Sequence, residues 1–122
     1  MLFRSAYNDA AGVTARFNLN VLVRINRELG GNFDTGAFLH RAIYNRDRHR
    51  IEMHLISRKA QTVRVLGKTF SFRAGESIHT ENSYKYSIER FNLLARVSGW
   101  SLLQSWTDEA GLFSVHALAA SD

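Results

Sequence analysis

The spacing of the apolar residues changes near residue 41 of this chain, from steps of four to steps of two. The members of the step-of-four series are Val13, Phe17, Val21, Ile25 and Leu29. This spacing is typical of an amphipathic helix that buries one stripe. Asn8 or Asp9 is a suitable N-cap, and Gly30-Gly31 is a suitable end. We predict a helix over 9–29, with the apolar stripe facing the core.

Between residues 41 and 86 apolar and polar residues alternate, which is the pattern of half-buried strands. The alternating apolar residues are Ile51, Met53, Leu55, Val63 and Val65. Turn-forming residues separate the runs at 45–50, 67–68 and 74–76. These runs predict a meander of four or five antiparallel strands. A short helix capped by Asp34 and reaching His40 is expected before them.

Residues 87–118 have the pattern of a second helix followed by a β-hairpin. Ser87 is a suitable N-cap for this helix. Its predicted apolar face consists of Phe91, Leu94 and Val97. The strands are predicted over 100–106 and 112–118. Because the strands are grouped together, the predicted fold class is α+β, in the order helix, antiparallel meander, helix and C-terminal hairpin.

The stretch from Ile78 to Tyr86 is unusually polar for a strand. It contains an acid, an amide, two hydroxyls, an amine and two phenols within nine residues. Glu81 and Ser83 are two residues apart, so on an extended backbone they point to the same face. A carboxylate beside a hydroxyl can bind a small polar ligand through charge-assisted hydrogen bonds. A solvated edge strand is the alternative interpretation.

The net charge of +5 raises the possibility of nucleic-acid binding. The densest basic cluster is Arg41, Arg46, Arg48, His49 and Arg50, interrupted by Asp47. We interpret it as a solvated turn rather than a phosphate-binding track. Strand aromatics such as Phe70, Phe72, Tyr84 and Tyr86 are explained better by a core than by base stacking. A nucleic-acid module stays an alternative, and it predicts binding that weakens steeply with salt.

Several classes of chemistry are excluded or unsupported. Cysteine is absent, which excludes disulfides and thiolate chemistry and is compatible with a reducing cytoplasm. The sequence has no run of 18 apolar residues, so no membrane span is predicted. It also has no glycine-rich phosphate loop and no G-x-S-x-G motif. His54 and His79 could approach each other across strands, but ordinary sheet histidines are the favoured interpretation, so no metal site is predicted.

Four stretches resemble the histidine-specific, S-adenosylmethionine-dependent methyltransferases of ergothioneine biosynthesis. They are AYNDAAGVT at 6–14 with Phe17-Asn18, RIEMHL at 50–55, HTENSYKY at 79–86, and WTD at 106–108 through GLF at 111–113. Their order and spacing match this family from about residue 4 to residue 118. The resemblance therefore covers nearly the whole chain.

The resemblance implies an enzyme that trimethylates the α-amino nitrogen of histidine to give hercynine, and we separately expect a cytoplasmic location. Residues 1–86 resemble part of the family's substrate-binding lid domain, and residues 87–122 resemble the last helix and hairpin of its Rossmann-like methyltransferase domain. The strands that bind S-adenosylmethionine would precede residue 1. The chain is thus expected to be a C-terminal fragment that alone binds no cofactor and is inactive, with the N-terminal methyltransferase domain as its partner.

The resemblance also implies four histidine-binding residues. Tyr7 matches the tyrosine at the backbone end of the substrate, Glu81 and Ser83 match the pair that hydrogen-bonds the imidazole, and Met53 matches the side chain against the ring. Imidazole has an N–H donor and a ring acceptor, which a carboxylate and a hydroxyl can satisfy together. No catalytic, cofactor-binding or metal-binding residue is assigned.

Two expectations about partners follow. The substrate could be another small amino acid rather than histidine, because a family resemblance does not by itself define the substrate. The hairpin at the C-terminal end would present an exposed strand edge, and such an edge could drive homodimerisation.

Overall fold

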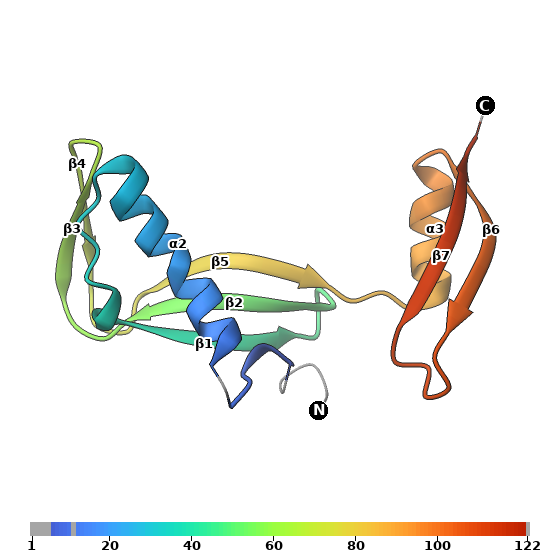
Figure 1. Ribbon diagram of the computed structural model, residues 1–122, viewed down its shortest axis with the longest axis horizontal. Coiled ribbons are helices and arrows are strands. Elements are labelled where there is room, and N and C mark those ends of the chain that lie inside the picture. Colours follow the sequence, from blue (N-terminus) through green and yellow to red (C-terminus); the bar gives the residue numbers. More distant parts are fainter. Residues whose placement is uncertain (1–5, 11, 122) are drawn as a thin grey trace. The chain divides into compact units, whose positions relative to one another are not determined.

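The computed structural model describes residues 6–10 and 12–121 (Figure 1). The chain divides into two compact units, Met1–Tyr84 and Lys85–Asp122. The predicted α+β class is confirmed, because each unit combines a helix with antiparallel strands. The predicted roles of segments 1–86 and 87–122 stay predictions. No helix in the described part of the chain is both long and apolar enough to cross a membrane.

In the first unit, helix α2 (Val13–Leu29) lies across one face of a three-stranded sheet (Figure 1). In their order across the sheet, the strands are β1 (Phe38–Asn45), β2 (Arg50–Ser57) and β5 (Ser77–Tyr84). Both pairings are antiparallel. β5 forms one edge of this sheet, which agrees with the edge-strand interpretation of its polar sequence and still permits a ligand site there.

Strands β3 (Gln61–Val65) and β4 (Lys68–Phe72) form a separate hairpin between β2 and β5 in the sequence. Its turn residues, Leu66 and Gly67, have φ angles of 49° and 75°, as a two-residue turn in a twisted hairpin requires. Ser57 then makes two backbone hydrogen bonds with the turn before β5. The strands are antiparallel as predicted, but they divide into small sheets because β5 pairs with β2.

Helix α2 begins at Val13 rather than near residue 9. The carboxylate of Asp9 accepts hydrogen bonds from the backbone N–H groups of Thr14 at 3.1 Å and Val13 at 2.9 Å. These bonds satisfy N–H groups that have no partner within the helix, and they lower the pKa of Asp9. Asp9 therefore caps the helix as predicted, although Gly12 stands between it and the first helical turn.

The predicted buried stripe of α2 is wrong. Phe17 is 66% exposed and Val13 is 58% exposed, whereas Asn18 and Leu22 are each 1% exposed. The helix faces the sheet with the neighbouring stripe, where Leu22 belongs to the core cluster and the buried amide of Asn18 finds hydrogen-bond partners. Periodicity identified the helix but not the side of it that meets the sheet.

The core of the first unit lies between α2 and the sheet. Leu22, Ala37, Phe38 and Leu55 form its fully buried cluster, and Phe33 and Phe72 pack against it. The rings of Phe38 and Phe72 meet edge to face with centroids 5.5 Å apart, a favourable aromatic geometry. Along β2 the residues Ile51, Met53 and Leu55 are buried as predicted, but the strand is not half-buried, because Glu52 on its other face is buried as well.

The short helix before β1 is a 3₁₀ turn that covers only Thr35–Ala37. Asp34 caps it as predicted, because its Oδ1 accepts a hydrogen bond from the N–H of Gly36 at 3.1 Å. The expected extension to His40 is wrong. His40 is already part of β1, where it pairs with Leu55.

The second unit contains α3 (Ile88–Val97) and a hairpin of β6 (Trp100–Thr107) and β7 (Ser114–Ala120). Ser87 caps α3 as predicted, by accepting from the N–H of Arg90 at 3.2 Å. β7 begins two residues later than predicted. Asp108 Oδ1 accepts hydrogen bonds from the N–H groups of Leu112 and Phe113, and these bonds hold both residues in the turn.

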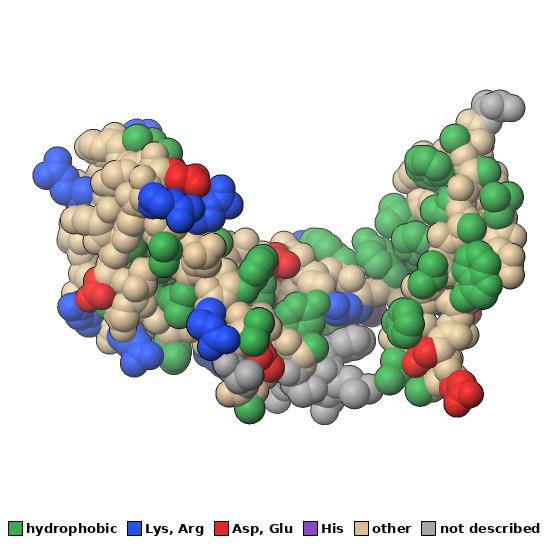
Figure 2. Space-filling model, in the orientation of Figure 1, with side chains coloured by type: hydrophobic (Ala, Val, Ile, Leu, Met, Phe, Trp, Pro, Cys, Tyr) green, Lys and Arg blue, Asp and Glu red, His purple; other side chains and the backbone are tan. Residues whose placement is uncertain are grey.

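Of the apolar face predicted for α3, Phe91 is half-buried and contacts the rings of Tyr86 and His116, but the rest of the face is exposed. Val97 is 73% exposed and Leu94 is 43% exposed, whereas Ala95 is buried. Figure 2 shows hydrophobic side chains over much of the visible face of this unit. Those that stay exposed include Leu93, Trp100, Leu103, Trp106, Leu112 and Phe113. The described part of this unit therefore buries little apolar surface of its own.

Candidate functional site

Two of the four predicted site residues are in direct contact. The hydroxyl of Tyr7, which lies shortly before α2, is 2.8 Å from Oγ of Ser83 on β5. These residues are 76 positions apart in the sequence. Both are half-buried. The fold thus brings together two hydroxyl groups whose proximity no sequence spacing could indicate.

The other two predicted residues are direct neighbours in the sheet. Met53 on β2 is the register partner of Glu81 on β5, and Ile51 is the partner of Ser83. Partners in an antiparallel pair have side chains on the same face. Met53 is buried at 3% exposed, whereas Glu81 is exposed. Met53, Glu81 and Ser83 therefore share the face of the sheet that Tyr7 contacts.

A β-bulge makes this arrangement possible. On β5, His79 pairs with His54 and Glu81 pairs with Met53, so Thr80 is one extra residue without a register partner. A bulge re-aims the residues that follow it. Ile78 is on the buried face. In a strand with strict alternation, Glu81 and Ser83 are an odd number of residues from Ile78 and would therefore lie on the opposite face. The prediction that Glu81 and Ser83 point the same way is confirmed, but the face they share is decided by the bulge.

Sequence reasoning missed three polar residues next to this face, Asn18, His40 and Thr80. The buried amide of Asn18 is 2.6 Å from the Thr80 hydroxyl and 2.9 Å from Nδ1 of His40. Nε2 of His40 is 2.8 Å from the backbone carbonyl of Tyr7. The available signal was Asn18, a polar residue among the apolar residues of a helix. When such a side chain is buried, it requires hydrogen-bond partners that are buried with it.

The chemical capacity of this face is binding rather than proton transfer. A carboxylate and two hydroxyls can accept and donate hydrogen bonds to a small ligand with a polar ring. The buried thioether of Met53 beside them suits contact with an aromatic surface. The absence of a catalytic residue from this chain stays a prediction.

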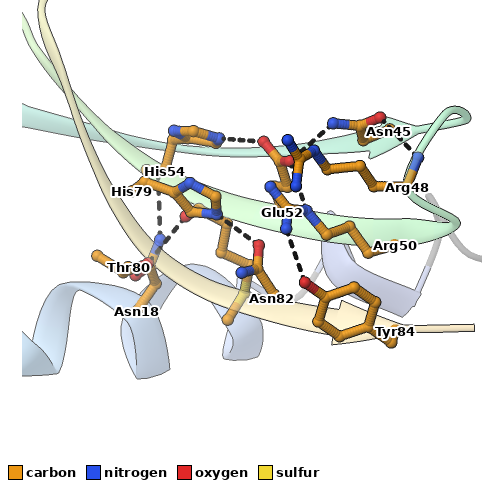
Figure 3. Close-up of polar contacts among 11 residues, drawn as sticks. Asn18, Asn45, Arg48, Arg50, Glu52, His54, His79, Thr80, Asn82 and Tyr84 are labelled. Carbon is orange, nitrogen blue, oxygen red and sulfur yellow. Dashed lines mark hydrogen bonds and ion pairs between the residues drawn. The ribbon is translucent and has the colours of Figure 1, made fainter.

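The opposite face of the sheet contains a buried ion-pair network centred on Glu52 (Figure 3). Its carboxylate accepts from Asn45 at 3.0 Å, from His54 at 3.0 Å and from Arg50 at 2.8 Å. These hydrogen bonds lower the pKa of Glu52 from 4.5 to about 2, and the bond from Asn45 has the largest effect. Arg50 also donates to the hydroxyl of Tyr84 at 2.8 Å. The network joins the ends of all three strands.

The predicted approach of two histidines occurs on this same face. The rings of His54 and His79 stack with centroids 4.5 Å apart. Potential metal-ligating atoms of Glu52, His54 and His79 lie within 4.8 Å of one another. The Glu52 carboxylate already accepts three hydrogen bonds, and the Arg50 guanidinium lies against it. We therefore interpret the group as structural, and the absence of a metal site stays a prediction.

Replacing Glu52 with glutamine is expected to reduce the acid sensitivity of the fold. The pKa of Glu52 is about 2 in the folded chain and 4.5 ordinarily. The hydrogen bonds to its carboxylate therefore stabilise the fold at pH values above 4.5. That stabilisation is lost as the pH falls through this interval. The Tm, measured across the same interval, should fall more steeply for the unsubstituted chain than for Glu52→Gln.

The matched control for this prediction is Glu76→Gln. Glu76 forms an exposed ion pair with Arg73 at 2.9 Å, and pairs of this kind contribute little to stability. Glu76→Gln should therefore keep the steep fall of the unsubstituted chain. Equal slopes for the unsubstituted chain and Glu52→Gln would count against the role of this network.

The basic cluster agrees with the solvated-turn interpretation. Arg46, Arg48 and His49 are exposed in the turn between β1 and β2, and Arg50 is held by Glu52. The prediction that a core explains the strand aromatics is wrong for three of them. Phe72 packs against the core, whereas Phe70, Tyr84 and Tyr86 are 47%, 48% and 47% exposed. No stacking track follows from these positions, and nucleic-acid binding stays the less favoured alternative.

Comparison with known proteins identifies relatives over nearly the whole chain. Residues 2–120 match the family model described as histidine-specific methyltransferase, SAM-dependent. A histidine N-alpha-methyltransferase of Mycolicibacterium smegmatis is 50% identical over 114 residues, which cover 90% of this chain and 35% of that protein. One from Mycobacterium tuberculosis is 46% identical over 117 residues, covering 94% of this chain and 36% of that protein. The chain thus spans about a third of the length of these curated relatives.

Proposed function

The chain belongs to the histidine-specific, SAM-dependent methyltransferases, and we propose that it supplies the histidine-binding part of such an enzyme. The observation that carries the proposal is the convergence of Tyr7, Ser83, Glu81 and Met53 on one face of the sheet. The names of the relatives from both mycobacterial organisms support histidine as the substrate. The reaction proposed is trimethylation of the α-amino nitrogen, the first step of ergothioneine biosynthesis.

Each side chain has a defined role in this proposal. The Glu81 carboxylate accepts the imidazole N–H of histidine, and the Ser83 hydroxyl donates to the other ring nitrogen. Met53 packs against the ring. The Tyr7 hydroxyl, beside Ser83, hydrogen-bonds the backbone end of the amino acid. Together these contacts orient the substrate, and orientation is a large part of what a transfer between two bound molecules requires.

The residues of this chain do not fit S-adenosylmethionine by themselves. All strand pairs in the described residues are antiparallel, so they lack the parallel strand, glycine-rich turn and helix that bind such cofactors. When bound to the whole enzyme, the cofactor supplies the methyl group. We propose that a preceding methyltransferase domain binds it, that 1–86 belongs to the substrate-binding lid, and that 87–122 completes the methyltransferase domain. The exposed apolar surface of the second unit supports that last assignment.

The test is a methylation assay with the enzyme that contains this chain at full length. Histidine and S-adenosylmethionine should give mono-, di- and trimethylated histidine by mass spectrometry. Equimolar competition among amino acids should leave histidine as the preferred substrate. Preferential methylation of another small amino acid would favour the alternative substrate, and the absence of any amino-acid methylation would count against the proposal.

The isolated chain is expected to bind S-adenosylmethionine no more than marginally and to leave histidine unmethylated. The physical reason is the lack of a cofactor-binding turn in its antiparallel sheets. Isothermal titration calorimetry of the chain with the cofactor checks this. Binding in the micromolar range would contradict it, and the full-length enzyme is the positive control.

Three further expectations stay predictions. Homodimerisation of the isolated chain through the exposed hairpin of its second unit would be detected by light scattering. A cytoplasmic location stays a prediction, with which the absence of cysteine is compatible. A nucleic-acid module, suggested by the charge of +5, would show oligonucleotide binding at low salt that weakens as salt is added.

A further inference from the structure

We propose that Thr80 and Asn18 are positioning residues for substrate selection, because they hold the β-bulge that turns Glu81 and Ser83 toward Tyr7. The inference rests on the proposed function, since it concerns how the histidine-binding side chains are aimed. Neither residue needs to touch the substrate. Their effect would pass through the backbone of β5.

The bulge interrupts the hydrogen-bonded ladder between β2 and β5, at the step from Met53 to His54. The carbonyl groups of both residues at this step receive hydrogen bonds from side chains. The Thr80 hydroxyl is 3.0 Å from the Met53 carbonyl. The Asn18 amide donates to the His54 carbonyl at 3.2 Å. Two side chains from outside β2 thus satisfy backbone groups where the register shifts.

Thr80 and Asn18 also bind each other. The Thr80 hydroxyl shares its single proton between the Met53 carbonyl at 3.0 Å and Oδ1 of Asn18 at 2.6 Å. Figure 3 shows the Thr80 and Asn18 side chains meeting between α2 and the sheet. Asn18 is only 1% exposed, so water cannot readily replace a lost partner. The extra residue of the bulge is therefore tied to the helix as well as to the neighbouring strand.

The same amide reaches the segment that carries Tyr7. Nδ2 of Asn18 donates to Nδ1 of His40 at 2.9 Å. With Nδ1 as an acceptor, the ring proton is on Nε2, which donates to the Tyr7 carbonyl at 2.8 Å. One buried asparagine thus connects the bulged strand, with Glu81 and Ser83, to the backbone that presents the Tyr7 hydroxyl.

The residue types match this task. Only an amide offers an acceptor to Thr80 and donors to both His40 and the His54 carbonyl. Leucine has a similar size but would leave Nδ1 of His40 and the His54 carbonyl without the hydrogen bonds that Asn18 donates to them. Valine in place of Thr80 keeps the shape and loses the hydroxyl, whereas serine keeps the hydroxyl. The chain therefore permits a test that separates hydrogen bonding from packing.

The experiment compares Thr80→Val with Thr80→Ser in the full-length enzyme, by calorimetric titration of histidine and of S-adenosylmethionine. Thr80→Val should weaken histidine binding about tenfold, the order expected for a buried hydrogen bond left unmade. Its cofactor affinity should stay within about twofold, because the bulge lies outside the proposed cofactor domain. Thr80→Ser should keep histidine affinity near that of the unsubstituted enzyme.

Asn18→Leu and Asn26→Leu form the second comparison. Asn26 lies on the same helix, and its amide bonds the backbone N–H and carbonyl of Phe33, each at 2.8 Å. Both substitutions lower stability, but only Asn18→Leu should lower the kcat/KM for histidine relative to phenylalanine. Equal effects of both, or equal histidine affinities of Thr80→Val and Thr80→Ser, would overturn the inference.

The same experiments distinguish a failure of the proposed function from a failure of the positioning role. If the unsubstituted enzyme neither binds nor methylates histidine, the proposed function is wrong and this inference falls with it. If the unsubstituted enzyme binds histidine and Thr80→Val binds it equally well, only the positioning role is overturned.

Discussion

Replacing Glu81 with alanine is expected to weaken histidine binding by the full-length enzyme about a hundredfold, the order for losing a hydrogen bond to a charged group inside a binding site. Glu81 lies beside buried Met53 and two residues before Ser83, so its carboxylate would face the imidazole of a bound histidine. Alanine leaves the ring N–H without an acceptor, and a site built around such a bond discriminates strongly among ligands. Cofactor affinity should stay within about twofold, because Glu81 lies outside the proposed cofactor domain.

Calorimetric titration with each ligand, together with amino-acid competition assays, checks this prediction. Glu81→Gln tests the charge, because the amide keeps the length of the side chain and its carbonyl acceptor. Glu76→Ala is the matched control, since Glu76 pairs only with exposed Arg73 among the contacts described. Unchanged selectivity for histidine in Glu81→Ala would refute the role given to Glu81.

Replacing Leu55 with alanine is expected to lower the free energy of unfolding of the first unit by about 3 kcal/mol. Leu55 is completely buried in the cluster with Leu22 and Phe38, where α2 meets β2. Alanine removes buried methyl groups and leaves a cavity that the surrounding side chains only partly fill. Leu39→Ala, at a 50% exposed position on β1, should cost less than about 1 kcal/mol.

The measurement must report on the first unit. Both tryptophans, Trp100 and Trp106, lie in the second unit, so tryptophan fluorescence would follow the wrong part of the chain. Hydrogen exchange at the amides of β2 during urea titration reports on the cluster itself. Comparable destabilisation by Leu55→Ala and Leu39→Ala would contradict the core assignment.

The local elements were predictable because short-range patterns encode them. Asp9, Asp34 and Ser87 cap helical segments as the sequence indicated. The alternation of Ile51, Met53 and Leu55 identified β2 and its buried face. Each of these features depends on neighbours within a few positions, where side-chain and backbone groups interact directly.

The errors concern which surfaces meet. Periodicity found both helices, yet the stripe of α2 that contains Phe17 is exposed and the stripe with Asn18 is buried. A step of four defines a face of a helix, but the partner surface decides which face is covered. At the bulge the sheet offers Asn18 an acceptor, the His54 carbonyl, and a donor, the Thr80 hydroxyl, so this polar residue of α2 can be buried.

The sequence by itself determined the α+β class, the order of the elements and, through its resemblance to a family, the four residues proposed to bind histidine. Only the tertiary structure decided that Tyr7 meets Ser83 and that Glu81 stands beside Met53 on that same face. The physical reason is the extra residue at Thr80. A strand alternates its side chains with a period of two, so a single unpaired residue changes the face of every side chain after it.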